Sequence, residues 1–176
     1  FLLHTLNYDF HYLSAEWHRW KFASGLNGMF QQSINKGTEY LTPGYRLFDV
    51  GCFLTANRNV GKWELSGGIR FDNRSMNGHE LFENGVRRFQ SFSRHFNGLT
   101  GSLGGIYHVS REINLRMNMA RGYRAPNISE LASNGIHEGT IRYELGNLQL
   151  KPENNLQLDF GADYSSDLFS AQISLF

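Results

Sequence analysis

Strict alternation of apolar and polar residues is the strongest pattern in this sequence. Between residues 62 and 72 the odd positions, from Trp63 to Phe71, hold apolar residues or glycine, and most even positions are charged. Successive side chains of a β-strand point to opposite faces, so a period of two predicts a strand with one apolar and one polar face. The pattern returns over residues 112–119, 155–164 and 169–175, and weaker versions cover residues 2–12, 20–30, 48–56 and 99–109. The sequence therefore predicts eight strands.

The links between these strands alternate between short and long. Short turns are expected at residues 13–15, 58–61, 109–111 and 165–167, and long links at residues 33–44, 75–90 and 121–152. Transmembrane barrels combine tight periplasmic turns with longer outer loops, and their strands have about 9 to 11 residues. The pattern thus favours an all-β fold in which about eight antiparallel, up-and-down strands form part of a transmembrane β-barrel.

A soluble sandwich of two antiparallel sheets is the alternative, because its strands alternate in the same way. The barrel is favoured by charged residues of the polar parity, which suit a water-filled lumen: Lys62, Glu64, Arg70, Asp72, Glu112, Arg116, Asp159 and Asp163. Aromatic residues near the short turns fit an interfacial girdle: Tyr12, Trp17, Trp63, Tyr107, Tyr164 and Phe169. Trp17 breaks parity with Trp20, so either the turn boundary differs by a residue or Trp17 faces inward.

Composition agrees with strands and argues against several partners. The chain has 19 glycines, 3 prolines and 14% aromatic residues, which suits β-structure. Lys and Arg total 17 against 16 Asp and Glu, so no basic excess points to nucleic acid. No apolar run approaches the ~20 residues of a membrane-spanning helix. Cys52 lies on the apolar parity and is expected to be lipid-facing or buried.

Two short motifs lie in the last long link. The first reads Arg-Gly-Tyr-Arg-Ala-Pro at residues 121–126, followed by Ser-Glu-Leu at residues 129–131, and the second runs from Gly146 to Glu153. This pair resembles the barrel motifs of TonB-dependent outer-membrane receptors, and the resemblance covers residues 114–160. The matching positions are Arg121, Tyr123, Arg124, Ala125, Pro126, Leu150, Lys151, Pro152 and Glu153. The family's second motif usually has Pro after Asn, where this chain has Leu148 and Gln149, which allows a different local turn.

The first motif also has a physical interpretation of its own. Pro126 lacks a backbone N–H and so ends strand pairing, and residues 129–131 can open a short helical turn. Two roles stay open for the motif residues. They fold the loop back against the barrel wall, or they contact the substrate directly.

The resemblance implies a receptor of the bacterial outer membrane. Such a receptor has a barrel of about 22 strands, an N-terminal plug, and import driven by the inner-membrane TonB energy complex. Residues 1–176 contain nothing like the plug, so they are expected to form one partial barrel domain without transport activity of its own. The unpaired backbone groups at its two outer strands are expected to pair with another copy, or to close the sheet into a small distorted barrel.

Candidate ligand residues lie in the long links. His137 stands between the two motifs, where haem receptors of the family carry an axial ligand, and it is followed by Glu138, Arg142 and Tyr143. These residues are the first candidate binding set, and His137 as a haem ligand is the alternative within the family.

Two arginines supply the second candidate set. Arg87 and Arg88 would suit an anionic ferric chelate, although a solvated loop face is the default interpretation. His79 and His95 are candidate partner ligands in and just after the same link. The remaining histidines lack the spacing of a zinc pair, and neither a structural metal nor a resident cofactor is expected.

The expected function is import of a scarce nutrient, foremost a ferric siderophore or another iron chelate. The alternatives are a haem receptor and a non-transport structural or adhesive β-protein. An enzyme is not expected, because the sequence has no nucleophile elbow, phosphate loop or paired-carboxylate setting. Ser24 and His18 share a parity, but nothing else supports a lipase-like site.

Overall fold

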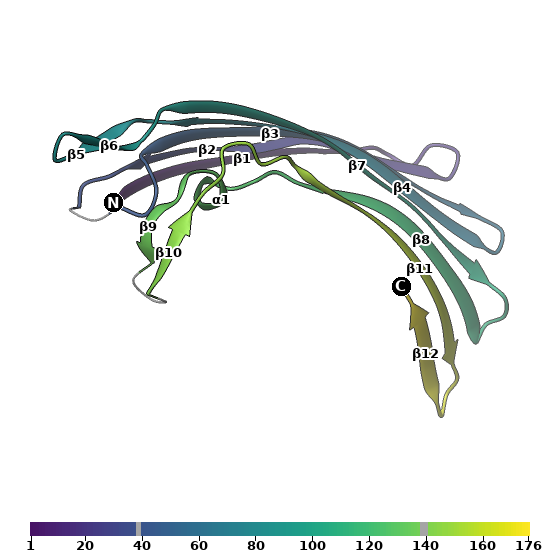
Figure 1. Ribbon diagram of the computed structural model, residues 1–176. Coiled ribbons are helices and arrows are strands. Elements are labelled where there is room, and N and C mark those ends of the chain that lie inside the picture. The colour runs from purple at the N-terminus through teal and green to yellow at the C-terminus, as the bar shows by residue number, and fades with distance from the viewer. Residues whose placement is uncertain (38–39, 138–140) are drawn as a thin grey trace.

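Eight long strands form one antiparallel sheet in the computed structural model, which describes residues 1–37, 40–137 and 141–176 (Figure 1). The sheet order is β1-β2-β3-β4-β7-β8-β11-β12, so each long strand pairs with the next one in the chain. The strands are β1 (Leu2–Leu13), β2 (Trp20–Ile34), β3 (Tyr45–Val60), β4 (Trp63–Gly78), β7 (Phe92–His108), β8 (Ile113–Arg124), β11 (Glu153–Ser165) and β12 (Ser170–Leu175). The predicted all-β, up-and-down antiparallel fold with eight strands is confirmed.

The long links contain small elements of their own. β5 (Leu81–Glu83) and β6 (Val86–Phe89) form one hairpin, and β9 (Asn134–His137) and β10 (Arg142–Leu145) form another. The helix α1 (Ile128–Ala132) lies between the two motifs, where a helical turn is predicted. Among the described residues, no helix is long and apolar enough to cross a membrane.

The sheet is a single curved layer with two unlike faces. Figure 1 shows an arch, with α1, β9 and β10 beneath it on the concave side. On the other, convex face, Leu65, Met117 and Leu158 are 41%, 52% and 44% exposed. Arg70 instead lines a cleft on the concave face. Because no second sheet covers the apolar face among the described residues, the soluble sandwich is wrong.

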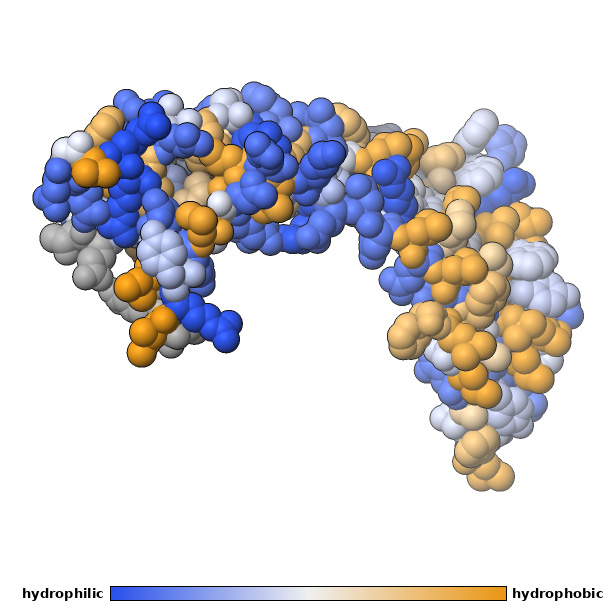
Figure 2. All heavy atoms as spheres, in the orientation of Figure 1, coloured by the Kyte–Doolittle hydropathy of each residue, from blue (hydrophilic) through white to orange (hydrophobic). Residues whose placement is uncertain are grey.

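Apolar residues gather toward the short turns. Figure 2 shows hydrophobic residues over β8, β11 and β12, and hydrophilic residues over the end of the arch that carries the long links. Cys52 follows the apolar parity and is exposed, as a lipid-facing thiol would be. Two aromatic pairs with tilted rings, Trp63 with Tyr107 and Tyr164 with Phe169, lie beside short turns, where the aromatic girdle is predicted.

A small buried core lies at the opposite end of the sheet. It consists of Tyr45, Leu47, Met76, Phe96 and Leu131, the last of which comes from α1. The first four extend from β3, β4 and β7 toward the concave side. The core therefore joins the wall to the loop that carries the motifs.

The strands run further toward the long links than predicted. β3 begins at Tyr45 rather than at residue 48, β4 continues to Gly78 rather than 72, and β7 begins at Phe92 rather than 99. In these extensions the apolar side chains, such as Leu47 and Met76, point to the concave side. In the extensions the apolar residues therefore occupy the positions that are polar in the rest of the strand. A prediction that follows apolar residues on one face only ends the strand too early.

The first short turn also differs from the prediction. It lies at Trp17–Trp20, where His18 and Arg19 have φ values of 50° and 65°, rather than at residues 13–15. Two successive left-handed residues are the geometry of a two-residue hairpin turn. Trp17 pairs with Trp20 and therefore shares its face. The misplaced turn boundary explains the break in parity.

The sheet does not close on itself. β1 and β12 are the outer strands of the sheet and do not pair with each other. The expected small distorted barrel is therefore not formed. Association through strand edges stays a prediction.

Candidate functional site

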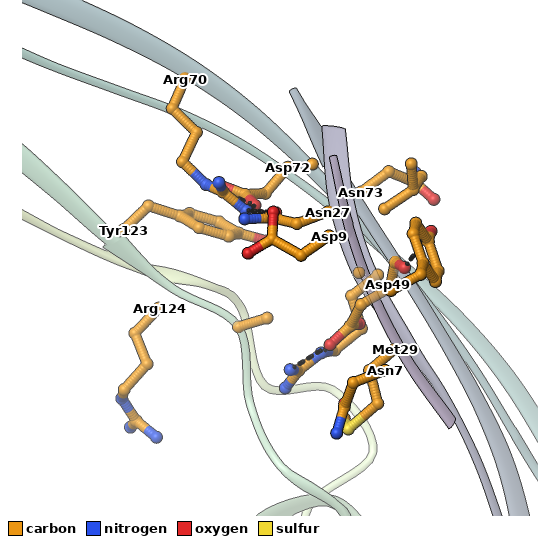
Figure 3. A pocket seen from close by; sticks show the side chains of 16 residues that line it. Asn7, Asp9, Asn27, Met29, Asp49, Arg70, Asp72, Asn73, Tyr123 and Arg124 are labelled. Atoms are coloured by element: carbon orange, nitrogen blue, oxygen red, sulfur yellow. Dashed lines mark hydrogen bonds and ion pairs between the residues drawn. The ribbon is translucent and has the colours of Figure 1, made fainter. Parts of the chain in front are cut away.

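A polar cleft of about 550 Å³ lies on the concave face near the middle of the arch. Its lining combines charged side chains from β3 and β4 with Tyr123 and Arg124 from the first motif (Figure 3). The charged side chains from β3 and β4, and Arg124, have the concave parity of their strands, so the same alternation that puts apolar residues outside brings them together. Tyr123 instead has the convex parity of β8 and lines the cleft from a part of β8 that no longer pairs with β7. The charged and amide side chains that line it include Asn27, Asp49, Arg70, Asp72 and Arg74.

Two arginines of β4 are held by carboxylates in the cleft. Arg74 donates from Nε and Nη2 to the two oxygens of Asp49, at 2.8 and 2.7 Å. Arg70 donates from Nε to Asp72 at 2.8 and 2.9 Å and from Nη2 to Asn27 at 2.8 Å. Both arginines therefore have a carboxylate partner on the wall, and the cleft offers a water-accessible polar surface.

Tyr123 covers part of this wall because β8 separates from β7. The β7–β8 pairing ends at Gly101 with Arg121, whereas β8 stays paired with β11 as far as Arg124. The Tyr123 ring then occupies the space that a Cβ at Gly98 would need. Its hydroxyl is buried without a hydrogen-bond partner among the described residues. The first motif thus bends the end of β8 over the inner face of β7.

Arg124 connects the two motifs. It donates from Nε and Nη2 to Glu153 at 2.9 and 2.8 Å, and from Nη1 to both oxygens of Glu130 at 2.8 and 2.9 Å. Glu130 also accepts from the backbone N–H of Asn127, whose side chain accepts from the N–H of Glu130. This reciprocal arrangement is a capping box at the start of α1. The hydrogen bond from the backbone N–H of Asn127 lowers the pKa of Glu130, and the hydrogen bonds from Arg124 lower it further.

The apolar residues of the motifs hold the loop against the wall. Leu131 is 1% exposed in the small core, and Ala125, Leu148 and Leu150 pack around that core. Arg94 of β7 donates to the carbonyl of Leu150 at 2.9 Å. These contacts show how the loop folds back, which is the first of the two roles expected for the motifs.

The remaining motif positions lie at the edge of this arrangement. Arg121 is exposed on the convex face and donates to Asn154 at 3.3 Å. Pro126 is buried beside the end of β8, whereas Lys151 is exposed. Asn147 caps the turn after it by accepting from the N–H of Gln149 at 2.9 Å. This contact forms at the position where the family's usual proline is absent.

The structure brings the two candidate ligand sets together. Arg88 donates to Glu83 at 2.6 Å, to the carbonyl of Tyr40 at 2.8 Å and to the carbonyl of Asn134 at 3.3 Å. Asn134 donates back to the carbonyl of Arg88 at 2.8 Å. The guanidinium of Arg88 thus fastens the β5–β6 hairpin to the β9–β10 hairpin, while the neighbouring Arg87 is exposed.

The β9–β10 hairpin carries the first candidate set. Arg142 and Tyr143 are exposed, and the Tyr143 hydroxyl donates to Asn134. The backbone of His137 pairs with Arg142. Glu138 lies outside the described residues. Ligand contact by any of these residues stays a prediction.

The histidine partners proposed from the sequence lie apart. His79 donates its backbone N–H to the carbonyl of Gly44 at 2.8 Å, at the long-link end of β4. His95 is exposed on the convex face of β7, away from the hairpins. Within the part of the chain that the structure describes, no three His, Cys, Asp or Glu side chains are placed to share a metal ion.

Sequence reasoning did not identify the cleft itself. Asp49 and Asn27 belong to strands whose alternation is weak, and their partners Arg74 and Arg70 are far away in sequence. The available signal was the recurrence of charged residues at concave positions of neighbouring strands. Using it requires the register between strands, which the sequence does not supply.

Comparison with known proteins agrees with this geometry. The family model described as "TonB dependent receptor-like, beta-barrel" matches residues 2–176. Among solved structures, the copper transporter OprC superposes with a TM-score of 0.74 at 20% identity, covering 98% of this chain and 29% of that one. No curated protein sequence matches.

Two further structures show the same fold at lower identity. The FrpB iron transporter from Neisseria meningitidis (F3-3 variant) has a TM-score of 0.69 at 16% identity, with 98% of this chain and 27% of that one covered. The ferric yersiniabactin uptake receptor FyuA from Yersinia pestis has a TM-score of 0.68 at 12% identity, with 98% and 28% covered. This chain therefore spans less than a third of the length of these structures. From the match over residues 2–176, the chain belongs to the family of TonB-dependent receptor β-barrels.

Proposed function

We propose that this chain forms part of the wall and outer loops of an outer-membrane transporter that imports a scarce nutrient, foremost an iron chelate. The observation that carries the proposal is the two-faced sheet, which combines an exposed apolar convex face with a charged concave face. An apolar face turned outward is stable in lipid, and a charged face turned inward is stable against water. A bacterial outer-membrane location follows from this proposal.

The hairpins at the long-link end support an anionic substrate. Arg87 and Arg142 are exposed there, and Tyr143 adds an exposed aromatic ring. Exposed guanidinium groups bind carboxylates and catecholate-type oxygens through charge-assisted hydrogen bonds. The names of two structural relatives, an iron transporter and a ferric yersiniabactin receptor, fit a ferric chelate, while the copper transporter keeps the metal open.

The energy source belongs to the same proposal. Receptors of this family depend on the inner-membrane TonB complex, and the polar cleft between Asp49 and Tyr123 would face a plug or the passing solute. The cleft charges are already paired with each other. A neutral, wettable wall lets a solute pass without being trapped.

The test is uptake by the full-length protein in cells starved of iron. Radiolabelled ferric siderophore should enter cells that carry the protein and should not enter cells that lack it or its TonB complex. Arg87→Ala combined with Arg142→Ala should raise the half-saturating concentration several-fold, because two cationic contacts are lost. Arg111→Ala, an exposed arginine at a short turn, is the matched control.

The outcomes separate the substrates. Equal uptake with and without the protein would reject iron-chelate import, and accumulation of copper instead would assign the metal. Haem titration of the wild type and of His137→Ala tests the haem alternative. Unchanged haem affinity in His137→Ala would remove His137 as a ligand.

A further inference from the structure

The convex face is apolar at mid-strand and becomes polar toward the long links. Strand register places Phe10, Leu26, Cys52, Phe71 and Leu99 side by side in one apolar row across five strands. The same register gives a second row across the same strands, which lies six residues, about 20 Å, from the first row in the direction of the long links. We call it the outer polar row: His4, Gln32, Arg46, Asn77 and Ser93. Every member of this row carries a hydrogen-bond donor, and none is apolar.

The acidic residues of the sheet strands are confined to the concave face. Each Asp and Glu of the eight-stranded sheet has the concave parity: Asp9, Asp49, Glu64, Asp72, Glu153, Asp159 and Asp163. Apart from tyrosines and Cys52, the ionisable side chains of the convex parity are basic: His4, Arg46, Arg58, His95 and Arg121. The convex face of the described strands therefore has a single sign of charge.

Arg46 is the centre of the outer polar row. It is exposed, and its cross-strand neighbours on the convex face are the uncharged Gln32 and Asn77. His95 lies on the next row toward the apolar belt, two residues along β7 from Ser93. Cross-strand neighbours on one face are about 5 Å apart, so the row offers adjacent donors around one guanidinium. No carboxylate of the described strands lies on this face to compete for it.

We propose that the outer polar row binds the phosphorylated headgroups of lipids in the outer leaflet, with Arg46 as the main phosphate contact. This inference rests on the membrane location in the proposed function. The row lies just beyond the apolar belt on the long-link side, at the depth of the headgroups in a barrel whose long loops face outward. A guanidinium flanked by amide and hydroxyl donors matches the oxygens of a phosphate diester. The charge complementarity selects an anionic lipid rather than a neutral one.

The experiment measures lipid preference in the full-length protein. Fluorescent phosphatidylglycerol and fluorescent phosphatidylcholine are titrated separately against the purified protein in neutral detergent. The wild type should prefer phosphatidylglycerol, and the preference should fall as salt is added, because exposed charges are screened. Arg46→Ala should weaken phosphatidylglycerol binding about fivefold, the contribution of one basic residue near an anionic surface. It should weaken phosphatidylcholine binding less, because choline offsets the charge of that phosphate.

Two variants control for charge and for position. Arg46→Lys should retain most of the preference, whereas Arg111→Ala, an exposed arginine beside a short turn, should retain all of it. Equal phosphatidylglycerol binding in the wild type and Arg46→Ala would overturn the role of the outer polar row while leaving the proposed function intact. Insertion of the wild type into vesicles of each lipid is measured separately, and failure to insert into either would overturn the membrane location itself.

Discussion

Arg124 and Glu153 face each other across β8 and β11, joined by two hydrogen bonds of 2.9 and 2.8 Å between residues 29 positions apart. The same guanidinium binds Glu130 on α1 through its third nitrogen. One side chain therefore holds the strand that enters the loop, the helix within it and the strand that leaves it. This geometry explains why the two motifs occur as a pair.

Replacing Arg124 by alanine should loosen the loop without unfolding the wall. The strand ladders on either side remain, but the connection between β8, α1 and β11 is lost. Amide hydrogen exchange in residues 128–134 should become several-fold faster, while exchange in the centres of β3 and β4 should not change. Mass-spectrometric exchange on the full-length protein measures both regions.

Arg124→Lys is the matched control for that change. Lysine keeps the charge but cannot bind two carboxylates in the fork geometry of a guanidinium. It should give an intermediate exchange rate. Unchanged exchange in Arg124→Ala would show that the apolar contacts alone hold the loop.

Leu131→Ala should cost more than any exposed substitution in the same loop. The side chain is 1% exposed among Leu47, Met76 and Phe96, so its removal leaves a cavity. Such truncations cost about 2–5 kcal/mol. The loss should appear as detachment of the loop, measured by limited proteolysis within residues 132–146.

Leu145→Ala provides the comparison for Leu131. Leu145 is 76% exposed on β10, so its truncation should change stability by less than about 0.5 kcal/mol. Equal proteolysis rates for the two variants would contradict the anchoring role of α1.

Acid should release the same loop through Glu130. Its pKa is held below the ordinary value of 4.5 by the N–H of Asn127 and then by Arg124. Because the pKa is lower in the folded state, the ionised carboxylate stabilises the docked loop fully above about pH 4.5. That contribution is lost as the pH falls through the folded pKa. Hydrogen exchange in α1, corrected for its intrinsic pH dependence, should therefore accelerate in acid.

Glu130→Gln tests the source of this pH dependence. The amide oxygen can still accept from Asn127, but it carries no charge that titrates. The variant should show a weaker docked loop near neutral pH and little further loosening in acid. A persistent acid transition in Glu130→Gln would assign it to another group.

A charge on the convex face should destabilise the protein only in lipid. Ile69 is 52% exposed in the apolar region, and arginine at the middle of a lipid-facing strand costs about 2–4 kcal/mol. Ile69→Arg should therefore unfold at lower urea concentration than the wild type when the full-length protein is held in vesicles. Ser102→Arg, an exposed residue of the concave parity on β7, should change the midpoint little. Equal effects of the two variants would contradict the assignment of the faces.

Much of the wall could be predicted because its two faces meet different solvents. The alternation from Trp63 to Phe71 reflects the difference between lipid and water on the two faces, and it predicts the orientation of residues such as Leu65. Counting the segments with this alternation predicted the number of strands. The strand ends could not be predicted in the same way. From Leu47 toward the long links the apolar residues of β3 point to the concave side, so the alternation loses its phase.

Local turns were harder to predict, for two different reasons. The turn at Trp17–Trp20 uses His18 and Arg19 at positive φ, residue types that give no turn signal. The β5–β6 hairpin does carry a signal, because Asn84 and Gly85 both have positive φ and form an Asn-Gly pair typical of two-residue hairpins. That signal was present in the sequence but was hidden within a long link.

The site required register as well as pattern. Arg124, Glu130 and Glu153 were identified as motif residues, but their mutual contacts depend on how β8 and β11 align. Arg88 is a candidate ligand residue from the sequence, and in the structure it binds Tyr40, Glu83 and Asn134, while ligand contact by it stays a prediction. The sequence alone does not distinguish a basic loop residue that binds a solute from one that binds a backbone carbonyl.

The position of the buried core has an evolutionary consequence. Loop and wall meet through a few side chains around Leu131, and the described residues between 134 and 145 contribute none of the buried members of that cluster. The tip of the loop can therefore be replaced, lengthened or given a new ligand preference while its attachment stays the same. A receptor built this way can change its cargo faster than its scaffold.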